Sequence, residues 1–356
     1  MRSMLPRLSA CLGVSALILS LSAFPATGWA QLAPSPDAPP VSNAPPPAPE
    51  EESVATFKLQ VNLVDVFFTV KAKDGTLVPH LTKDDCTISE DKAPQKLKSF
   101  VAETQQPITL GILLDTSGSQ QNVLPLEQDV GGQFLQRVLR QKDEAFLLSF
   151  DVDVDLMQDY TNSPRLLTRA MNKAQINTAG GNGAAGIPGA GGGTVPTIGN
   201  PKGTVLYDAV YLASNEKLNQ ETGRKAMILL TDGEDEGSDH KIQDAIAAAQ
   251  KTNVLVYVIL IADRGFYGGF GYSGFSAMKK LTEETGGRLI DVGNNGKKLE
   301  AAFQQIEDEL RTEYVASYTP TNTKLDGSFR HLGVECKGDG MKVQVRKGYY
   351  ATPPQN

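Results

Sequence analysis

The chain has 356 residues, of which 40% are hydrophobic, and a formal net charge of −7. This length suits one large domain with a smaller one beside it. An acidic chain without a basic cluster repels phosphate backbones, which argues against nucleic acid as a partner.

The first 30 residues have the pattern of a secretory signal peptide. Arg2 and Arg7 precede an apolar stretch over residues 12–21, and Ala30 is a small residue at the expected cleavage point. Cleavage removes two positive charges and no acid, so the net charge would go from −7 to −9. We therefore expect an exported protein, periplasmic or secreted, with no membrane span after cleavage. An uncleaved signal that anchors the chain is the alternative.

Residues 31–53 and 54–104 differ sharply in composition. The first segment is rich in proline and alanine and predicts an extended, disordered linker, since it cannot bury enough apolar surface to fold. The second alternates apolar and polar residues, which predicts β-strands. The alternation slips by one position between Leu63 and Val64, which indicates a bulge or a break between two strands.

Residues 105–312 alternate apolar strands with amphipathic helices. This predicts an α/β fold, a doubly wound and mostly parallel sheet with helices on both faces. Residues 313–351 return to β-type alternation, so we expect them to pack with residues 54–104 as one small β domain built from both flanks. We expect strands near 107–114, 145–150, 153–158, 226–231, 254–262 and 288–292, and helices near 122–140, 164–176, 204–218, 240–251, 275–285 and 297–312.

Cys86 and Cys336 are the two cysteines outside the signal peptide, one in each β flank. Each shares a strand face with apolar neighbours. In an oxidising compartment the pair can form a disulfide that joins the two ends of the chain. Two buried free thiols, which behave as small hydrophobic side chains, are the alternative. The sequence leaves both open.

A set of oxygen-bearing side chains lies at the ends of two apolar runs. Ser117 and Ser119 follow Asp115 at alternate positions, directly after the first run, and Asp232 ends another. Thr204 comes after a glycine-rich loop and opens a helical pattern. In an open α/β sheet, ligands bind at the carboxyl ends of the strands, where both aspartates are expected. Oxygen ligands of this kind suit Mg²⁺ or Mn²⁺.

Three segments in this order resemble a von Willebrand factor type A domain with a complete metal-ion-dependent adhesion site. They are D-T-S-G-S at 115–119, G-T-V-L-Y-D-A at 203–209 and I-L-L-T-D-G at 228–233. The resemblance covers residues 105–312, and the β flanks are similar to those of acidobacterial-type secreted proteins that carry this domain. It implies that Ser117 and Ser119 bind the metal directly, that Thr204 does so in the ligand-competent form, and that Asp115 and Asp232 bind directly or through water.

The resemblance implies a metal-dependent adhesion module. If both carboxylates bind through water, the cation keeps a positive charge and an open position, which an Asp or Glu of a protein partner can complete. Mg²⁺ or Mn²⁺ is expected, with Ca²⁺ less favoured. The alternative is an envelope or matrix scaffold in which the metal is only structural. We do not expect an enzyme, because the sequence has neither an H-E-x-x-H nor a G-x-S-x-G motif.

Two loops add candidates beside this set. Thr194, in the glycine-rich residues 179–203, competes with Thr204 as the metal-binding threonine. A second loop, over residues 265–272, carries aromatic side chains that can anchor a partner or fold onto their own loop. These aromatic residues are Phe266, Tyr267, Phe270 and Tyr272.

Two acidic stretches invite a metal interpretation. We interpret residues 233–239 as a solvated helix entry, because acids favour the start of a helix and their spacing is not that of an EF-hand. Asp151, Asp153 and Asp155 alternate along a strand or turn, and we interpret them as a solvated face.

Overall fold

The apolar run that precedes Asp115 forms a strand buried along its whole length, β5 (Ile108–Asp115). The computed structural model describes residues 63–102, 106–177, 203–262 and 274–353. In it β5 is a central strand of a six-stranded sheet. The other strands are β6 (Glu144–Phe150), β7 (Val154–Thr161), β8 (Arg224–Thr231), β9 (Val254–Leu260) and β10 (Leu289–Asp291). Their order is β10-β9-β8-β5-β6-β7, and every neighbouring pair is parallel except β6 and β7.

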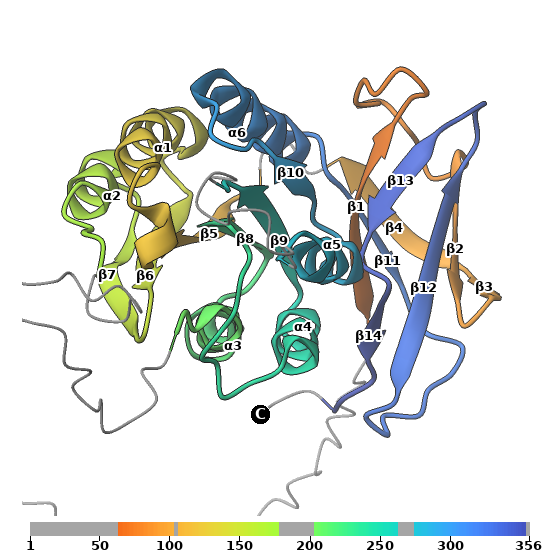
Figure 1. Ribbon diagram of the computed structural model, residues 1–356. Helices are drawn as coiled ribbons and strands as arrows, with labels where there is room; N and C mark the ends of the chain where they lie inside the picture. Colours follow the sequence, from red (N-terminus) through yellow and green to blue (C-terminus); the bar gives the residue numbers. More distant parts are fainter. Residues whose placement is uncertain (1–62, 103–105, 178–202, 263–273, 354–356) are drawn as a thin grey trace, which may run out of the picture. The chain divides into compact units, whose positions relative to one another are not determined.

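Helices cover both faces of this sheet, as the sequence predicts (Figure 1). On one face lie α1 (Leu124–Val138), α2 (Pro164–Met171) and α6 (Gly296–Arg311), which share a buried apolar cluster with alternate residues of β5. On the other lie α3 (Leu206–Leu212), α4 (Ile242–Lys251) and α5 (Gly274–Thr285). Because β5 is buried on both faces, a continuous apolar run rather than an alternating one forms it.

Two helices end earlier than their apolar pattern predicts. The helix expected over 164–176 ends at Met171, where the Gln128 side chain donates to the Met171 carbonyl (3.0 Å) and to the Ala174 carbonyl (2.9 Å). The helix expected over 204–218 is α-helical only to Leu212 and continues as a π-turn and a 3₁₀-turn to residue 220. There the Ser214 hydroxyl donates to the Val210 carbonyl (2.8 Å), a bond that competes with regular helix formation.

The two β flanks pair with each other, which confirms the small β domain predicted from both ends of the chain. The first sheet has the order β13-β1-β11-β4 and the second β14-β12-β2-β3, so each mixes strands from before and after the α/β domain. The strands are β1 (Val64–Lys71), β2 (Cys86–Glu90), β3 (Ala93–Gln95), β4 (Leu97–Ala102), β11 (Tyr314–Tyr318), β12 (Phe329–Cys336), β13 (Lys342–Val345) and β14 (Gly348–Tyr350).

Alternate residues of these strands form the core of the β domain. Val66, Phe68 and Val70 point inward from β1, where they meet Tyr314 of β11 and Ile88 of β2. The inward phase begins after the slip between residues 63 and 64, as the alternation predicts. The earlier half of that pattern lies outside the described residues, as do the predicted signal peptide and linker. The domain boundaries drawn from the sequence stay predictions.

Buried ion pairs join the two domains at the amino ends of the parallel strands. Arg224, the first residue of β8, donates through Nε to Glu313 at 2.9 Å, and both side chains are almost wholly buried. Glu309 of α6 accepts from Lys71 and from Arg288, each at 2.8 Å. A buried carboxylate needs such a partner, because burial without one costs several kcal/mol. These pairs hold the β domain at the edge of the sheet opposite Asp115.

None of the helices within the described ranges is long and apolar enough to cross a membrane.

Cys86 and Cys336 face each other in the register of β2 and β12 and are joined as a disulfide. The bond closes a loop of 250 residues that contains the entire α/β domain.

We predict that the Cys86→Ala/Cys336→Ala variant loses about 2–5 kcal/mol of unfolding free energy, because the disulfide restricts the unfolded chain. Urea denaturation measures the loss. Wild-type protein in reductant should unfold at the urea concentration of the variant. Alkylation of both cysteines in native protein without reductant would show that the bond does not form.

Candidate metal centre

The candidate site begins where β5 and β8 end side by side. The two strands are parallel, with Leu114 opposite Leu230, so Asp115 and Thr231 become neighbours. The Thr231 hydroxyl donates to Asp115 Oδ2 at 2.6 Å. Asp232 follows directly, and both aspartates are almost wholly buried. Two carboxylates that are far apart in the sequence therefore meet at the carboxyl edge of the sheet.

The loop after β5 brings the two serine hydroxyls together. The Ser117 amide donates to Asp115 Oδ1 at 3.0 Å, which folds the chain back over the carboxylate. The hydroxyl oxygens of Ser117 and Ser119 then lie 3.0 Å apart. Ser117 occupies the position before a short 3₁₀-turn, but its side chain makes no capping hydrogen bond there. Helix capping therefore does not account for this serine.

Thr204 lies in the loop that leads into α3, between the loops that follow β6 and β8. Its carbonyl accepts from the amides of Glu236 (3.0 Å) and Gly237 (3.1 Å). The amide of the next residue, Val205, donates to the Asp151 carbonyl at 2.7 Å. Main-chain bonds thus fix the Thr204 segment to both neighbouring loops. Its rival Thr194 lies outside the described residues.

The two aspartates carry an electrostatic cost that a cation would relieve. Burial and then the charge of Asp232 raise the pKa of Asp115 to about 7, against the opposing effect of hydrogen bonds from Ser117 and Thr231. Two carboxylates held together away from water cannot both ionise readily. A divalent cation between or above them supplies the missing charge, and the hydroxyl pair supplies further oxygen ligands. The residues present therefore fit a hard divalent cation.

Glu127 is a third buried acid near this pair, and the sequence analysis missed it. Its side chain is 0% exposed, and neither of its carboxylate oxygens accepts a hydrogen bond from the described residues. Burial, followed by the charges of Asp115 and Asp232, raises its pKa well above the ordinary value. The helical spacing could have identified Glu127, because it lies on the same buried face as Val123 and Val130.

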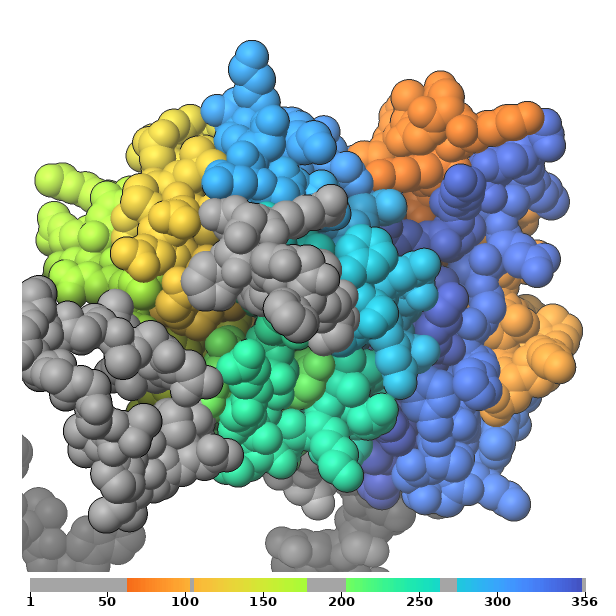
Figure 2. Space-filling model, in the orientation of Figure 1, coloured from red at the N-terminus to blue at the C-terminus, as the bar shows by residue number. Residues whose placement is uncertain are grey.

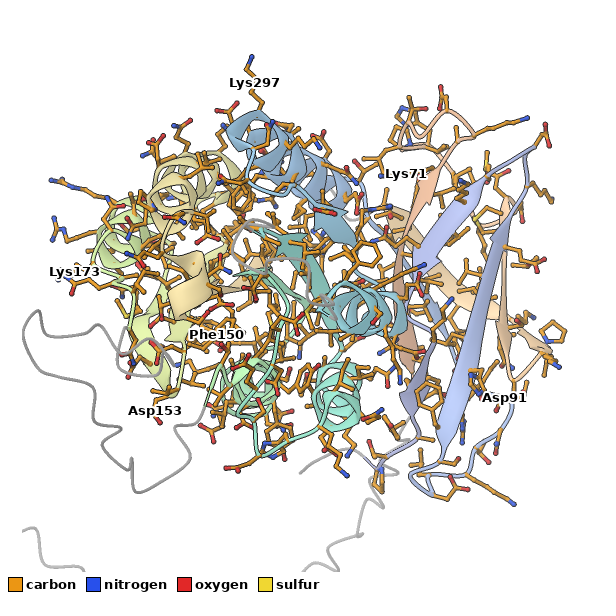
Figure 3. The ribbon with its side chains drawn as sticks, in the orientation of Figure 1. Lys71, Asp91, Phe150, Asp153, Lys173 and Lys297 are labelled. Carbon is orange, nitrogen blue, oxygen red and sulfur yellow. A yellow bond between two sulfur atoms is a disulfide. The ribbon has the colours of Figure 1, made fainter. Side chains whose placement is uncertain are left out.

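The interpretation of Asp151 as part of a solvated face is wrong. The Asp151 carboxylate accepts hydrogen bonds from the Thr116 hydroxyl (2.9 Å) and from the Asn177 side-chain amide (3.0 Å). These bonds hold the loop that carries Ser117 against the loop after β6. Asp153 is exposed, as expected, and lies at the tip of its loop (Figure 3). The difference arises because only the folded chain brings residues 116 and 177 beside Asp151.

The acidic stretch after β8 is also less solvated than expected. Asp235 is half-buried and accepts from the Tyr207 amide at 3.0 Å, at the start of α3. Glu234 accepts from the Gly274 amide at 2.8 Å, at the start of α5. These acids therefore satisfy the free amides of two other helices instead of beginning their own. The turn begins at Gly233, whose φ of +84° favours glycine.

Some predicted features are not located. The aromatic residues Phe266, Tyr267, Phe270 and Tyr272 lie outside the described residues. Within the described ranges, no three His, Cys, Asp or Glu side chains are arranged to hold a metal.

The sheet topology, with a single antiparallel edge and the D-x-S-x-S loop at the carboxyl end of β5, agrees with the resemblance seen in the sequence. The α/β domain is von Willebrand factor A-like in fold. No protein-family profile matches the chain, and no curated protein matches it. The chain is similar to several solved structures.

A von Willebrand factor type A protein from Catenulispora acidiphila is 10% identical, with a TM-score of 0.44, over 83% of this chain and 74% of that one. Proximal thread matrix protein 1 of the mussel byssus, with zinc in its MIDAS motif, is 16% identical with a TM-score of 0.45. That match covers 62% of this chain and spans 50% of the byssus protein. BatB from Bacteroides thetaiotaomicron is 17% identical with a TM-score of 0.41, over 57% and 99% of the two chains.

The buried acids predict an unusual dependence of stability on pH. Folding raises the pKa of Asp115 and Glu127 above their ordinary values near 4, so their protonated forms favour the folded state. That stabilisation is complete below pH ~4 and is lost as pH rises toward the folded pKa values. In chelator, we expect the melting temperature to fall by about 5 °C between pH 5 and pH 8.

Glu127→Gln should reduce this fall, because a neutral amide replaces a carboxyl that must ionise. Glu300→Gln on the exposed face of α6 is the matched control and should leave the fall unchanged. Thermal denaturation across the pH range measures both. Equal pH profiles for wild type and Glu127→Gln would contradict the assigned role of Glu127.

Proposed function

We propose that this protein is an exported adhesion-type module that binds a divalent cation and, through it, an acidic side chain of a protein partner. The proposed ligands are Asp115, Ser117, Ser119, Thr204 and Asp232. One observation carries the proposal. Two buried carboxylates end neighbouring strands, and a pair of serine hydroxyls 3.0 Å apart lies in the loop beside them.

The donor set determines which ligand would complete the site. Hydroxyl groups bring no charge, so two carboxylates at most neutralise a divalent cation, and carboxylates that bind through water neutralise it less. Mg²⁺ and Mn²⁺ favour octahedral oxygen coordination. The cation would supply a Lewis-acidic position for an anionic oxygen from outside the protein. An Asp or Glu of a partner protein has the matching charge and geometry.

The alternative is a scaffold in which the cation only ties the three loops together. The loops are already tied without it, since Val205 donates to the Asp151 carbonyl and Glu236 donates to the Thr204 carbonyl. The Thr116 hydroxyl adds a third link to Asp151 at 2.9 Å. A cation is therefore not needed to hold the loops. This favours a role in binding a ligand over a purely structural role.

We expect calorimetric titration of the purified protein with Mg²⁺ or Mn²⁺ to show one site, absent in the Ser117→Ala/Ser119→Ala variant. The reason is that two of the uncharged oxygen ligands are removed while both carboxylates remain. Ser99→Ala, an exposed serine of β4, is the matched control and should bind like wild type. Equal binding by the double variant would remove the serines from the site.

The partner chemistry is tested with peptides selected from a display library in the presence of Mg²⁺. We expect the selected peptides to lose at least tenfold in affinity when chelator is added, or when their Asp or Glu is replaced by Asn or Gln. Metal binding without any chelator-sensitive, acid-dependent peptide would contradict the adhesion role and support the scaffold.

A further inference from the structure

A cavity of about 610 Å³ lies between the end of α4 and the C-terminal strand β14. Gln250 and Lys251 line it from α4, Asp65 from β1, and Tyr349 and Tyr350 from β14. In Figure 2 the surfaces of α4 (blue-green) and of the C-terminal strands (dark blue) adjoin. Because β9 begins directly after α4, the cavity lies at the amino edge of the sheet, opposite the candidate metal centre. Its volume is typical of small-molecule sites.

Arg346, which lines this cavity, is a buried cation. Its side chain is 7% exposed, and it forms no ion pair with a carboxylate of the described residues. One terminal nitrogen donates to the main-chain carbonyl of Asp65 at 2.9 Å, and Nε has no hydrogen-bond partner. The guanidinium lies 5.7 Å from the Tyr349 ring. Burial lowers the pKa of Arg346 to about 10, against the opposing effect of Tyr318, Tyr349 and Asp65.

Other buried arginines of this protein are paired, which makes Arg346 an exception. Arg330 donates to Glu90 at 3.0 Å, and Arg224 donates to Glu313 at 2.9 Å. Burial of a charge is costly unless a charge of opposite sign and hydrogen bonds compensate it, and an anionic ligand would supply both to Arg346. A cavity directly beside the guanidinium is where that ion could enter.

The remaining charges on the cavity wall leave it positive. Lys251 lies with Nζ 5.3 Å from the Tyr350 ring centre and forms no ion pair with the described acids. Asp65 is the acid on the wall, and its carboxylate already accepts from the Ser317 hydroxyl at 2.6 Å. The end of α4 contributes a partial negative charge, which Lys251 in its last turn offsets. Lys251 and Arg346 together bring two positive charges against the one negative charge of Asp65, which also acts on Arg346, so the wall keeps an excess of positive charge.

We propose that this cavity binds a small organic carboxylate, with its anionic group on Arg346 and its apolar body against Tyr349, Tyr350 and Leu325, which also lines the cavity. A guanidinium presents a planar fork of donors that matches a carboxylate. Lys251 adds long-range attraction. The aromatic walls favour a ligand that is larger than acetate and carries a flat apolar group. The site is separate from the candidate metal centre and requires no cation.

The test uses benzoate as the probe and benzamide as its uncharged isostere, titrated into the purified full chain and followed by NMR. We expect millimolar binding of benzoate, at least tenfold weaker binding of benzamide, and no effect of chelator. Arg346→Gln should weaken benzoate at least tenfold, and Lys251→Met about threefold. Lys297→Met is the matched control, because Lys297 points away from the molecule on α6 (Figure 3), and it should bind like wild type.

If Arg346→Gln does not fold, Arg346→Lys replaces it in the test. Lysine keeps the positive charge but lacks the planar guanidinium donors, so the affinity for benzoate should fall at least threefold. Equal affinity for benzoate and benzamide would overturn the proposal. The absence of benzoate binding at a 50-fold excess of benzoate over protein would also overturn it. The weakest affinity that counts as a site here is a dissociation constant of about 1 mM. Unchanged binding in the Arg346 variant would also overturn the proposal.

Discussion

The burial of Asp115 beside Asp232 is the physical constraint on which the candidate site depends. Parallel strands end at the same edge of a sheet, so β5 and β8 bring the two carboxylates together away from water. The Thr231 hydroxyl and the Ser117 amide each donate to Asp115 and offset part of the cost. Protonation or a cation must supply the rest. The adjacent serine hydroxyls are further oxygen donors for the proposed cation.

The loops around this edge are built to hold the site in place. Asp151 accepts from Thr116 and Asn177 and so fixes the loop that carries the serines. Asp235 and Glu234 anchor the loop after β8 to the starts of two helices. Acidic residues therefore serve two purposes here, as candidate ligands and as hydrogen-bond acceptors for free main-chain amides. This explains how so many acids lie at one edge of an acidic protein.

The β domain closes the chain at the opposite edge. Each of its sheets contains strands from both flanks, and the Cys86–Cys336 disulfide joins the same two flanks covalently. Arg224 with Glu313, and Arg330 with Glu90, bury their charges as pairs. Among the described residues Arg346 forms no such pair, and it lines a cavity at this edge of the sheet. The proposed ligands differ accordingly, with a divalent cation at the edge that carries Asp115 and Asp232 and an organic carboxylate at the edge that carries Arg346.

Sequence patterns determined which elements form and in what order. An unbroken apolar run specified β5 as a buried central strand, the 3.6-residue spacing specified the helices, and the alternation after Leu63 specified the inward face of β1. The positions of Asp115 and Asp232 at strand ends followed from the same patterns. These properties are local, because hydrophobic periodicity depends only on which faces of an element are buried.

Tertiary structure alone decided which side chains meet. The sequence periodicity places Glu127 on the apolar face of α1, but its burial near two other acids depends on how α1 packs on the sheet. Asp151 looked solvated until the fold placed Thr116 and Asn177 beside it. The cavity at Arg346 requires β1, α4 and β14, whose residues are far apart in the chain. Such contacts and the energies of buried charges arise from long-range packing, which no local pattern in the sequence encodes.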